Sequence, residues 1–301
     1  MVRALRSMMR FLLKRFSMLL SRLPLKTVTR IGRALGWVYG HVVRYHRGDA
    51  LRALQRSFPE KSPSEVRAIA DRMYAHLGIN IVETVRLPYL SNDSLRSQMV
   101  VEGEEIVKKA LGRGKGAIIL GGHVGNWEMM VSVTPLWGYS LTVIAKELKG
   151  ATVNDFWNTV RSRFGVNVLP PKNAFRPCLK TLKNNGLVGF ILDQNMTRKE
   201  GVFVDFFGLP ASTSPGLAYM AARSGAPVLP AFTLRREDGR HDIRVMEPIE
   251  PPTDHQPETI RQFTQQYTKI IEDVVRQHPE QWIWCHRRWR TQPRAQQQGP
   301  A

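Results

Sequence analysis

The stretch Gly116–Met130, GAIILGGHVGNWEMM, constrains the fold more than any other part of the chain. It begins with an apolar run, Ala117–Leu120, which predicts a buried strand, and continues through two glycines to His123. Asn126 is a candidate N-cap, and the residues after it predict the start of a helix. A strand, a glycine turn and a helix in this order are typical of open α/β sheets, which bind ligands at the carboxyl ends of their strands.

His123 and Glu128 are the reactive side chains of this stretch. On one regular helix they would point about 140° apart, so they face each other only if His123 lies in the turn and Glu128 in the first helical turn. A neutral imidazole accepts a proton from an attacking hydroxyl, and a carboxylate orients it and stabilises the imidazolium. The pair therefore predicts general-base chemistry. The alternative is structural, because acidic residues favour first helical turns.

Strand and helix patterns alternate through the rest of the chain, which predicts an α/β fold with a central, mostly parallel sheet flanked by helices. We expect strands at 140–145, 166–169, 187–192, 228–234 and 243–248, and helices at 62–87, 102–111, 153–164, 175–184, 217–224 and 257–278. Asp193 and Gln194 follow the strand at 187–192, so they are expected at the same sheet edge as His123. Asp193 also suits a simple strand-end turn.

Residues 1–58 form a basic segment in which arginine and lysine alternate with long apolar side chains. Its longest uncharged run before Arg30, Phe16–Ser21, is far shorter than the ~20 residues that a spanning helix needs. We expect a helix lying in the membrane interface. Gly36 and Gly40 belong to the next apolar stretch and would let that stretch pack closely on this helix. The alternative is a helix that docks on its own domain. Residues 59–294 are expected to form the α/β domain, and 295–301 a disordered tail.

The net charge of +19 indicates an anionic partner, such as acidic lipid, lipid phosphates, an acidic carrier protein or nucleic acid. The N-terminal pattern favours lipid over nucleic acid, and the chain shows no signature of a nucleic-acid-binding module. The two cysteines, Cys178 and Cys285, match no metal or redox spacing, so we expect unpaired thiols. A metal hydrolase that uses His123 and Glu128 as ligands is a weaker alternative, because the third ligand is missing.

Several stretches resemble, in chain order, the landmarks of the late lipid A acyltransferases, the lauroyl/myristoyl transferase family of the lysophospholipid acyltransferase superfamily. These stretches are His123 with an acidic residue at Glu128, Arg161 four before Gly165, Asp193-Gln194, the run from FFG at 206–208 through Thr213 to GAPVLP at 225–230, and the closing WIWCHRRWR at 282–290. The resemblance implies a glycerolipid acyltransferase-like fold. It also implies that His123 is the base, that Glu128 orients it, and that substrate contacts come from Arg161 (or its neighbour Arg163), Asp193, Gln194, Thr213, Arg287 and Arg288.

The function implied by this resemblance is transfer of a fatty acyl chain from an acyl-carrier-protein thioester to a hydroxyl of a phosphorylated lipid A precursor. The expected location is the cytoplasmic face of the inner membrane, and no cofactor or metal is expected. The chain has no Gly-x-Ser-x-Gly elbow, which favours direct transfer over a serine acyl-enzyme. A lysophospholipid or glycolipid acceptor and a coenzyme A donor remain open.

Overall fold

The structure, a computed structural model, describes residues 2–146 and 150–294, so the expected tail at 295–301 lies outside the described residues. A seven-stranded sheet forms its centre, in the strand order β1-β9-β8-β2-β5-β3-β4. All neighbouring strands run parallel except β8 and β9, which run antiparallel. The prediction of an α/β fold with a mostly parallel central sheet is confirmed.

The strands of this sheet are β1 (Met99–Glu102), β2 (Ala117–Gly121), β3 (Leu141–Ile144), β4 (Asn167–Leu169), β5 (Leu187–Ile191), β8 (Val228–Arg235) and β9 (His241–Val245). A separate antiparallel hairpin joins β6 (Val202–Phe206) to β7 (Leu209–Thr213). The expected strands correspond to β2, β3, β4, β5, β8 and β9, and β9 begins and ends earlier than predicted.

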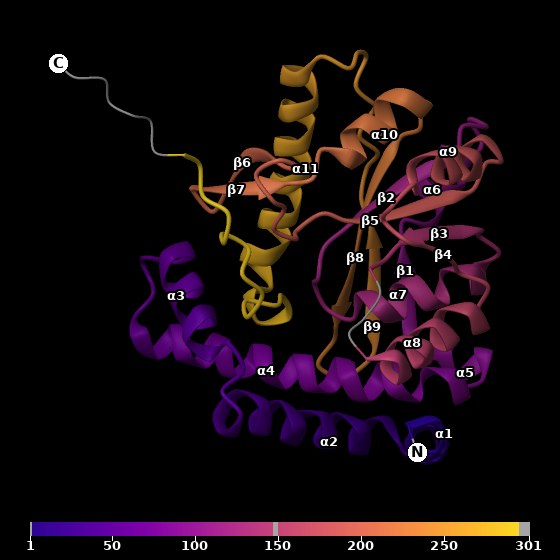
Figure 1. The fold of residues 1–301 in the computed structure, drawn as a ribbon, viewed down its shortest axis with the longest axis vertical. Coiled ribbons are helices and arrows are strands. Elements are labelled where there is room, and N and C mark those ends of the chain that lie inside the picture. The colour runs from indigo at the N-terminus through magenta and orange to yellow at the C-terminus, as the bar shows by residue number, and fades with distance from the viewer. Residues whose placement is uncertain (1, 147–149, 295–301) are drawn as a thin grey trace.

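The longer helices are α1 (Val2–Ser21), α2 (Leu25–Trp37), α3 (Arg47–Ser57), α4 (Pro63–Arg86), α8 (Ala151–Arg163) and α11 (Pro257–Gln277). Shorter ones are α5 (Asn92–Ser97), α6 (Glu104–Leu111), α7 (Trp127–Val133), α9 (Phe175–Lys183) and α10 (Gly216–Ser224), and a π-helical turn, Val38–Val42, continues α2. Figure 1 shows α2 and α4 lying lengthwise beneath the sheet, with α11 on one side of it and α7 and α8 on the other.

Alternate residues of β2 pack on opposite sides of the sheet, as the strand period requires. Ile118 and Leu120 join the core that contains Ile271 of α11. Ile119 faces the other way and packs against the cluster that contains Met130 of α7. Both faces of the sheet are therefore covered by helices, which explains the continuous apolar pattern of this strand.

The hairpin of β6 and β7 and the edge strand β1 were not predicted. Phe207 and Gly208 form the hairpin turn, and both have positive φ angles, 59° and 71°. A two-residue turn of this kind normally carries Asn-Gly or Asp-Gly, so a phenylalanine there conceals the turn signal. β1 has only four residues, which is too short to show a clear alternation.

Helix α2 packs against α4 through glycines on both helices. A Cβ at Gly36 would lie 2.1 Å from the carbonyl oxygen of Tyr74, and one at Gly40 would lie 2.8 Å from the Tyr74 ring. A Cβ at Gly78 would lie 2.2 Å from the carbonyl oxygen of Gly32. The expectation that Gly36 and Gly40 pack on the first helix is therefore wrong, since their close partner is α4.

We expect Gly78→Ala to lower the free energy of unfolding by about 1–3 kcal/mol or more, because the added methyl overlaps the backbone of α2. Gly112→Ala is the matched control, since its Cβ meets backbone oxygens only at 3.4 Å in a helical conformation. Denaturant unfolding of both purified variants tests this. Equal stabilities of Gly78→Ala and Gly112→Ala would contradict the close packing of the two helices.

Candidate active site

The register of two neighbouring strands brings His123 and Asp193 together. β2 and β5 are parallel neighbours in which Gly121 pairs with Ile191. His123 and Asp193 each follow that pair by two residues, at the carboxyl ends of their strands. The Nδ1 of His123 lies 2.7 Å from the Oδ1 of Asp193, and the backbone N–H of His123 donates to Oδ2 at 2.7 Å. The predicted placement of these two residues at one sheet edge is confirmed.

Asp193 is fully buried and held as an anion. Trp282, which follows α11, donates its indole N–H to the Oδ2 of Asp193 at 2.7 Å. Burial alone raises the pKa of Asp193, but the charge of His123 and the hydrogen bonds from His123 and Trp282 outweigh it and leave the pKa below its usual range. An anionic Asp193 requires a proton on Nδ1 of His123, which leaves Nε2 as the acceptor.

The Nε2 of His123 is the ring nitrogen that remains to accept a hydrogen bond. The side-chain Nε2 of Gln194 lies 3.3 Å from it, which is consistent with an amide N–H donated to the imidazole. His123 and Gln194 line a cavity of about 900 Å³ whose other walls are mainly apolar. The structure thus presents an oriented base to a space that holds a lipid-sized ligand.

Glu128 also lines this cavity, but its carboxylate is bonded to Arg161. The Nε and Nη2 of Arg161 donate to the two oxygens of Glu128 at 2.7 and 2.8 Å. In the structure the carboxylate that orients His123 is therefore Asp193, and Glu128 instead orients Arg161. Glu128 projects from the first turn of α7, where the guanidinium of α8 reaches it. Arg163, the alternative to Arg161 in the sequence analysis, donates to the carbonyl oxygens of Leu87 and Leu90.

The loop that carries His123 is held from below by α4. Asn126 caps α7 by accepting from the backbone N–H of Met129 at 3.1 Å, as predicted, and its amide donates to Glu83 at 2.8 Å. Asn80 donates to the carbonyl oxygen of Gly125 at 2.6 Å. Gly125 has a φ of 56°, and a Cβ there would meet the carbonyl oxygen of Thr233 at 1.6 Å, so this position requires glycine.

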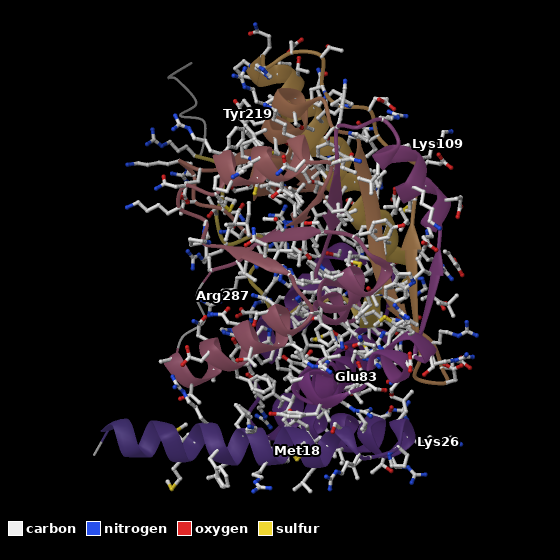
Figure 2. The ribbon with its side chains drawn as sticks, turned by 90° about the vertical axis from the view of Figure 1, so that its right-hand side faces the viewer. Met18, Lys26, Glu83, Lys109, Tyr219 and Arg287 are labelled. Atoms are coloured by element: carbon white, nitrogen blue, oxygen red, sulfur yellow. The ribbon has the colours of Figure 1, made fainter. Side chains whose placement is uncertain are left out.

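Glu83 lies at the centre of a buried charged cluster. Arg235 of β8 forms an ion pair with both of its oxygens and also donates to Asn80 at 2.7 Å. The Nε2 of His241 lies 3.2 Å from Glu83. Burial alone raises the pKa of Glu83. Arg235 and His241 lower it by more than burial raises it, so the net shift is downward. Figure 2 shows Glu83 inside the molecule, above the N-terminal helices that carry Met18 and Lys26.

The remaining predicted substrate residues have protein partners. Arg288 is fully buried, and its guanidinium donates to the hydroxyl of Thr213 and, at 2.9 Å, to the carbonyl oxygen of Ser212. Arg287 lies at the surface and donates to Asp49 of α3 at 3.2 Å. In the described part of the chain, the cavity lining includes neither these arginines nor Thr213. The structure assigns Arg288 and Thr213 to holding the closing segment against the hairpin of β6 and β7.

Trp282 and His286 are site residues that the sequence did not single out. His286 lies with its ring 6.0 Å from that of His123, and burial lowers its pKa to about 4. Among the described residues, His123, Asp193 and His286 are the group whose potential metal-ligand atoms lie within 4.8 Å of one another. However, the Nδ1 of His123 and the Oδ1 of Asp193 are 2.7 Å apart, which is the distance of a hydrogen bond. Two ligand atoms of a tetrahedral zinc would lie about 3.3 Å apart.

Comparison with known proteins identifies related sequences. Residues 1–291 match the family described as bacterial lipid A biosynthesis acyltransferase. A lipid A biosynthesis acyltransferase of Haemophilus influenzae is 26% identical over 279 residues, covering 92% of this chain and 86% of the relative. The lipid A biosynthesis lauroyltransferase of Escherichia coli is 24% identical, covering 91% and 89%.

A phosphatidylinositol mannoside acyltransferase of Mycobacterium tuberculosis is 32% identical, but over only 49% of this chain and 48% of its own length. Among solved structures, the 1-acyl-sn-glycerophosphate acyltransferase PlsC of Thermotoga maritima matches with a TM-score of 0.38 and 19% identity. That match covers 83% of this chain and 97% of PlsC.

We expect Glu83→Gln to lower the free energy of unfolding at pH 7 by about 3–5 kcal/mol, because it leaves Arg235 buried without its counter-charge. The lowered pKa of Glu83 means that its contribution is complete above the usual carboxyl pKa of 4.5 and is lost as the pH falls below it. The difference from the wild type should therefore narrow below that pH. Glu250→Gln, in an exposed pair with Arg113, is the control and should unfold like the wild type. A pH-independent difference would contradict this account.

Proposed function

The chain belongs to the bacterial lipid A biosynthesis acyltransferase family, and on this premise we propose that it transfers a fatty acyl chain from an acyl-carrier-protein thioester to a hydroxyl of a lipid A precursor. The observation that carries the proposal is the pair of His123 and Asp193, joined at 2.7 Å with Nε2 of His123 next to the apolar cavity. Such a pair abstracts a proton from an alcohol, and the cavity suits an acyl chain beside it.

The proposed step is a direct displacement at the thioester carbonyl. The acceptor hydroxyl attacks this carbon while Nε2 of His123 takes its proton, and the new C–O bond gives a tetrahedral oxyanion. When the oxyanion collapses, the C–S bond breaks and the imidazolium returns the proton to the departing thiolate. Asp193 stabilises the imidazolium between these two events, because its carboxylate stays anionic under the influence of His123 and Trp282.

Arg161 is the proposed anion-binding residue of the site. Its guanidinium lines the cavity, and the bidentate pair with Glu128 fixes its plane. Two of the five N–H groups serve Glu128, and we propose that others hold the developing oxyanion or a phosphate of the acceptor. In this proposal Glu128 is a positioning residue for Arg161, and the orienting role expected for Glu128 passes to Asp193.

The N-terminal apolar surface suits contact with a bilayer. It comprises exposed side chains of α1, α2, the π-helical turn and the residue after it, namely Met8, Met9, Phe11, Leu12, Phe16, Leu19, Ile31, Leu35, Trp37, Val38, Val42 and Val43. Exposed Lys14, Arg15, Lys26, Arg30 and Arg33 lie on the same helices, and exposed Arg22 lies between α1 and α2. None of the described helices is both long and apolar enough to cross a membrane. We propose that this surface lies in the interface of an anionic membrane, the cytoplasmic face of the inner membrane.

The proposed function predicts how the base and its partner contribute to activity. With a purified acyl-carrier-protein thioester and a lipid A precursor, His123→Ala should abolish transfer, and Asp193→Asn should lower kcat/KM by about 10²- to 10⁴-fold. Glu128→Gln keeps an acceptor for Arg161 and should cost less than Asp193→Asn. The reverse order, or wild-type activity of a folded His123→Ala protein, would refute the proposed roles.

The same assay separates the alternative substrates. Coenzyme A thioesters replace the carrier-protein donor, and a lysophospholipid or a mannosylated phosphoinositide replaces the lipid A precursor. Mass spectrometry of membrane lipids from cells with and without the gene then shows which lipid gains an acyl chain. A chain gained only by another lipid would overturn the acceptor while leaving the acyltransferase chemistry in place.

A separate prediction concerns the N-terminal apolar surface. Phe16→Gln combined with Leu19→Gln should weaken binding to liposomes containing anionic lipid at least tenfold, because two exposed apolar side chains are lost. Tyr219→Gln is the control: Tyr219 is also exposed but lies at the opposite end of the molecule from Met18 (Figure 2), so it should bind normally. Co-sedimentation measures both. Unchanged binding of the double variant, or stronger retention by DNA at matched salt, would contradict a membrane interface.

A further inference from the structure

The closing segment of the chain pairs with the loop that carries His123. The backbone N–H of Gly125 donates to the carbonyl oxygen of Gln281 at 2.8 Å, and Val124 and Trp282 form an antiparallel bridge next to this bond. Val124 directly follows His123 in the chain. The backbone of Trp282 is therefore attached to the same loop as the base, and this attachment fixes where its indole lies relative to the imidazole.

Three aromatic rings hold the indole of Trp282 in its orientation. The ring centroids of Trp282 are 4.6 Å from that of Trp284, 4.8 Å from that of His286 and 5.5 Å from that of Phe206. Trp282 is only 1% exposed, so water does not compete for its N–H. With the ring held in this way, the N–H points at the Oδ2 of Asp193, which accepts it at 2.7 Å.

Asp193 uses its two oxygens differently. Oδ1 accepts from Nδ1 of His123, whereas Oδ2 accepts both the backbone N–H of His123 and the indole N–H of Trp282. Each hydrogen bond to the carboxylate stabilises its negative charge, so the donors on Oδ2 weaken the attraction of Asp193 for a proton on the imidazole. Of these two donors, the indole is the one that a side-chain substitution removes.

The other charged or titratable groups around the base are neutral, cationic or paired near pH 7. Burial lowers the pKa of His286 to about 4, so its imidazole is neutral there. Burial also lowers the pKa of Arg288, to about 10, and its guanidinium remains a cation. Across the cavity, Glu128 and Arg161 form an ion pair of their own. We therefore expect the proton shared by the base and its aspartate to be the one that titrates at this end of the cavity.

We propose that Trp282 is a positioning residue that sets the pH range in which His123 works as a base. This inference rests on the proposed function, because it concerns the proton that the imidazole takes from the acceptor hydroxyl. Without the indole N–H, Asp193 attracts that proton more strongly, and the pair of His123 and Asp193 holds it more tightly. The base is free only above the pH at which this proton leaves. Loss of the donor therefore moves the acidic limb, the fall in kcat/KM at low pH, to higher pH.

Trp282→Phe should move the acidic limb up by about half to one pH unit, because a charge-assisted hydrogen bond is lost. The ratio of its kcat/KM to that of the wild type should then fall about three- to tenfold between about pH 8.5 and a pH below both limbs. Trp284→Phe is the matched control. Trp284 is also fully buried, but its indole donates to the carbonyl oxygen of Pro279, at 2.6 Å, so its acidic limb should coincide with that of the wild type.

The experiment measures kcat/KM of the full-length wild type and variants from about pH 5.5 to 8.5. A second variant, Trp282→β-(3-benzothienyl)alanine, has sulfur in place of the indole N–H, so it keeps the bicyclic shape and loses only the donor. A limb that moves up in both variants of Trp282 and stays in place in Trp284→Phe supports the proposal. An unmoved limb in the benzothienyl variant, whatever the height of its profile, or an equal shift in Trp284→Phe, overturns it.

A measurement without substrate separates this inference from the proposed function. The ring protons of His123, assigned by their absence in His123→Gln, are followed by NMR across the same pH range. The midpoint of their titration should rise in Trp282→Phe and stay in place in Trp284→Phe. If no lipid is acylated but this pattern holds, the proposed function fails and the role of Trp282 stands. If transfer occurs but neither the acidic limb nor the midpoint depends on Trp282, the role of Trp282 fails alone.

Discussion

The hydrogen bond between His123 and Asp193 is the interaction on which the site depends, and it is a product of the sheet rather than of one loop. β2 and β5 are neighbours in register, so residues at equal distances beyond their ends meet. Trp282 and the backbone of His123 use the second oxygen of Asp193, which leaves the first for the imidazole. The carboxylate is therefore satisfied on both oxygens while fully buried, and His123 lines the cavity with its Nε2 next to the amide of Gln194.

A second buried cluster fixes the position of the loop that carries His123. Glu83, Asn80 and Arg235 bind one another, and through Asn126 and Gly125 they bind the loop. Buried ion pairs add little net stability, but removing one partner is strongly destabilising. The cluster thus fixes geometry, because the loop has one arrangement in which every charge keeps its partner. The same helix, α4, also contacts α1 and α2, so it joins the site to the N-terminal apolar surface.

Most elements were predictable because their apolar periods are regular and their ends carry clear caps, as Asn126 does for α7. The placement of His123 and Asp193 at one sheet edge followed from both lying at strand ends. The partner of His123 did not follow from spacing, because Glu128 is near in sequence whereas β5 becomes the neighbour of β2 only through the strand order. The role of Trp282 does not follow from the sequence for the same reason. The resemblance predicts that Arg288 binds substrate, whereas its buried guanidinium donates to Thr213 and Ser212.

The dependence of Asp193 on Trp282 has a consequence for biosynthesis. The ribosome synthesises the apolar, cationic helices α1 and α2 first and Trp282 nearly last, since domains form from the amino terminus during translation. In the proposed function, the N-terminal apolar surface is therefore available to a bilayer long before the carboxylate of Asp193 has its partner Trp282. On that proposal, truncated products that end before Trp282 would keep the lipid-binding surface but lack the donor that completes Asp193, so activity would follow membrane binding in time.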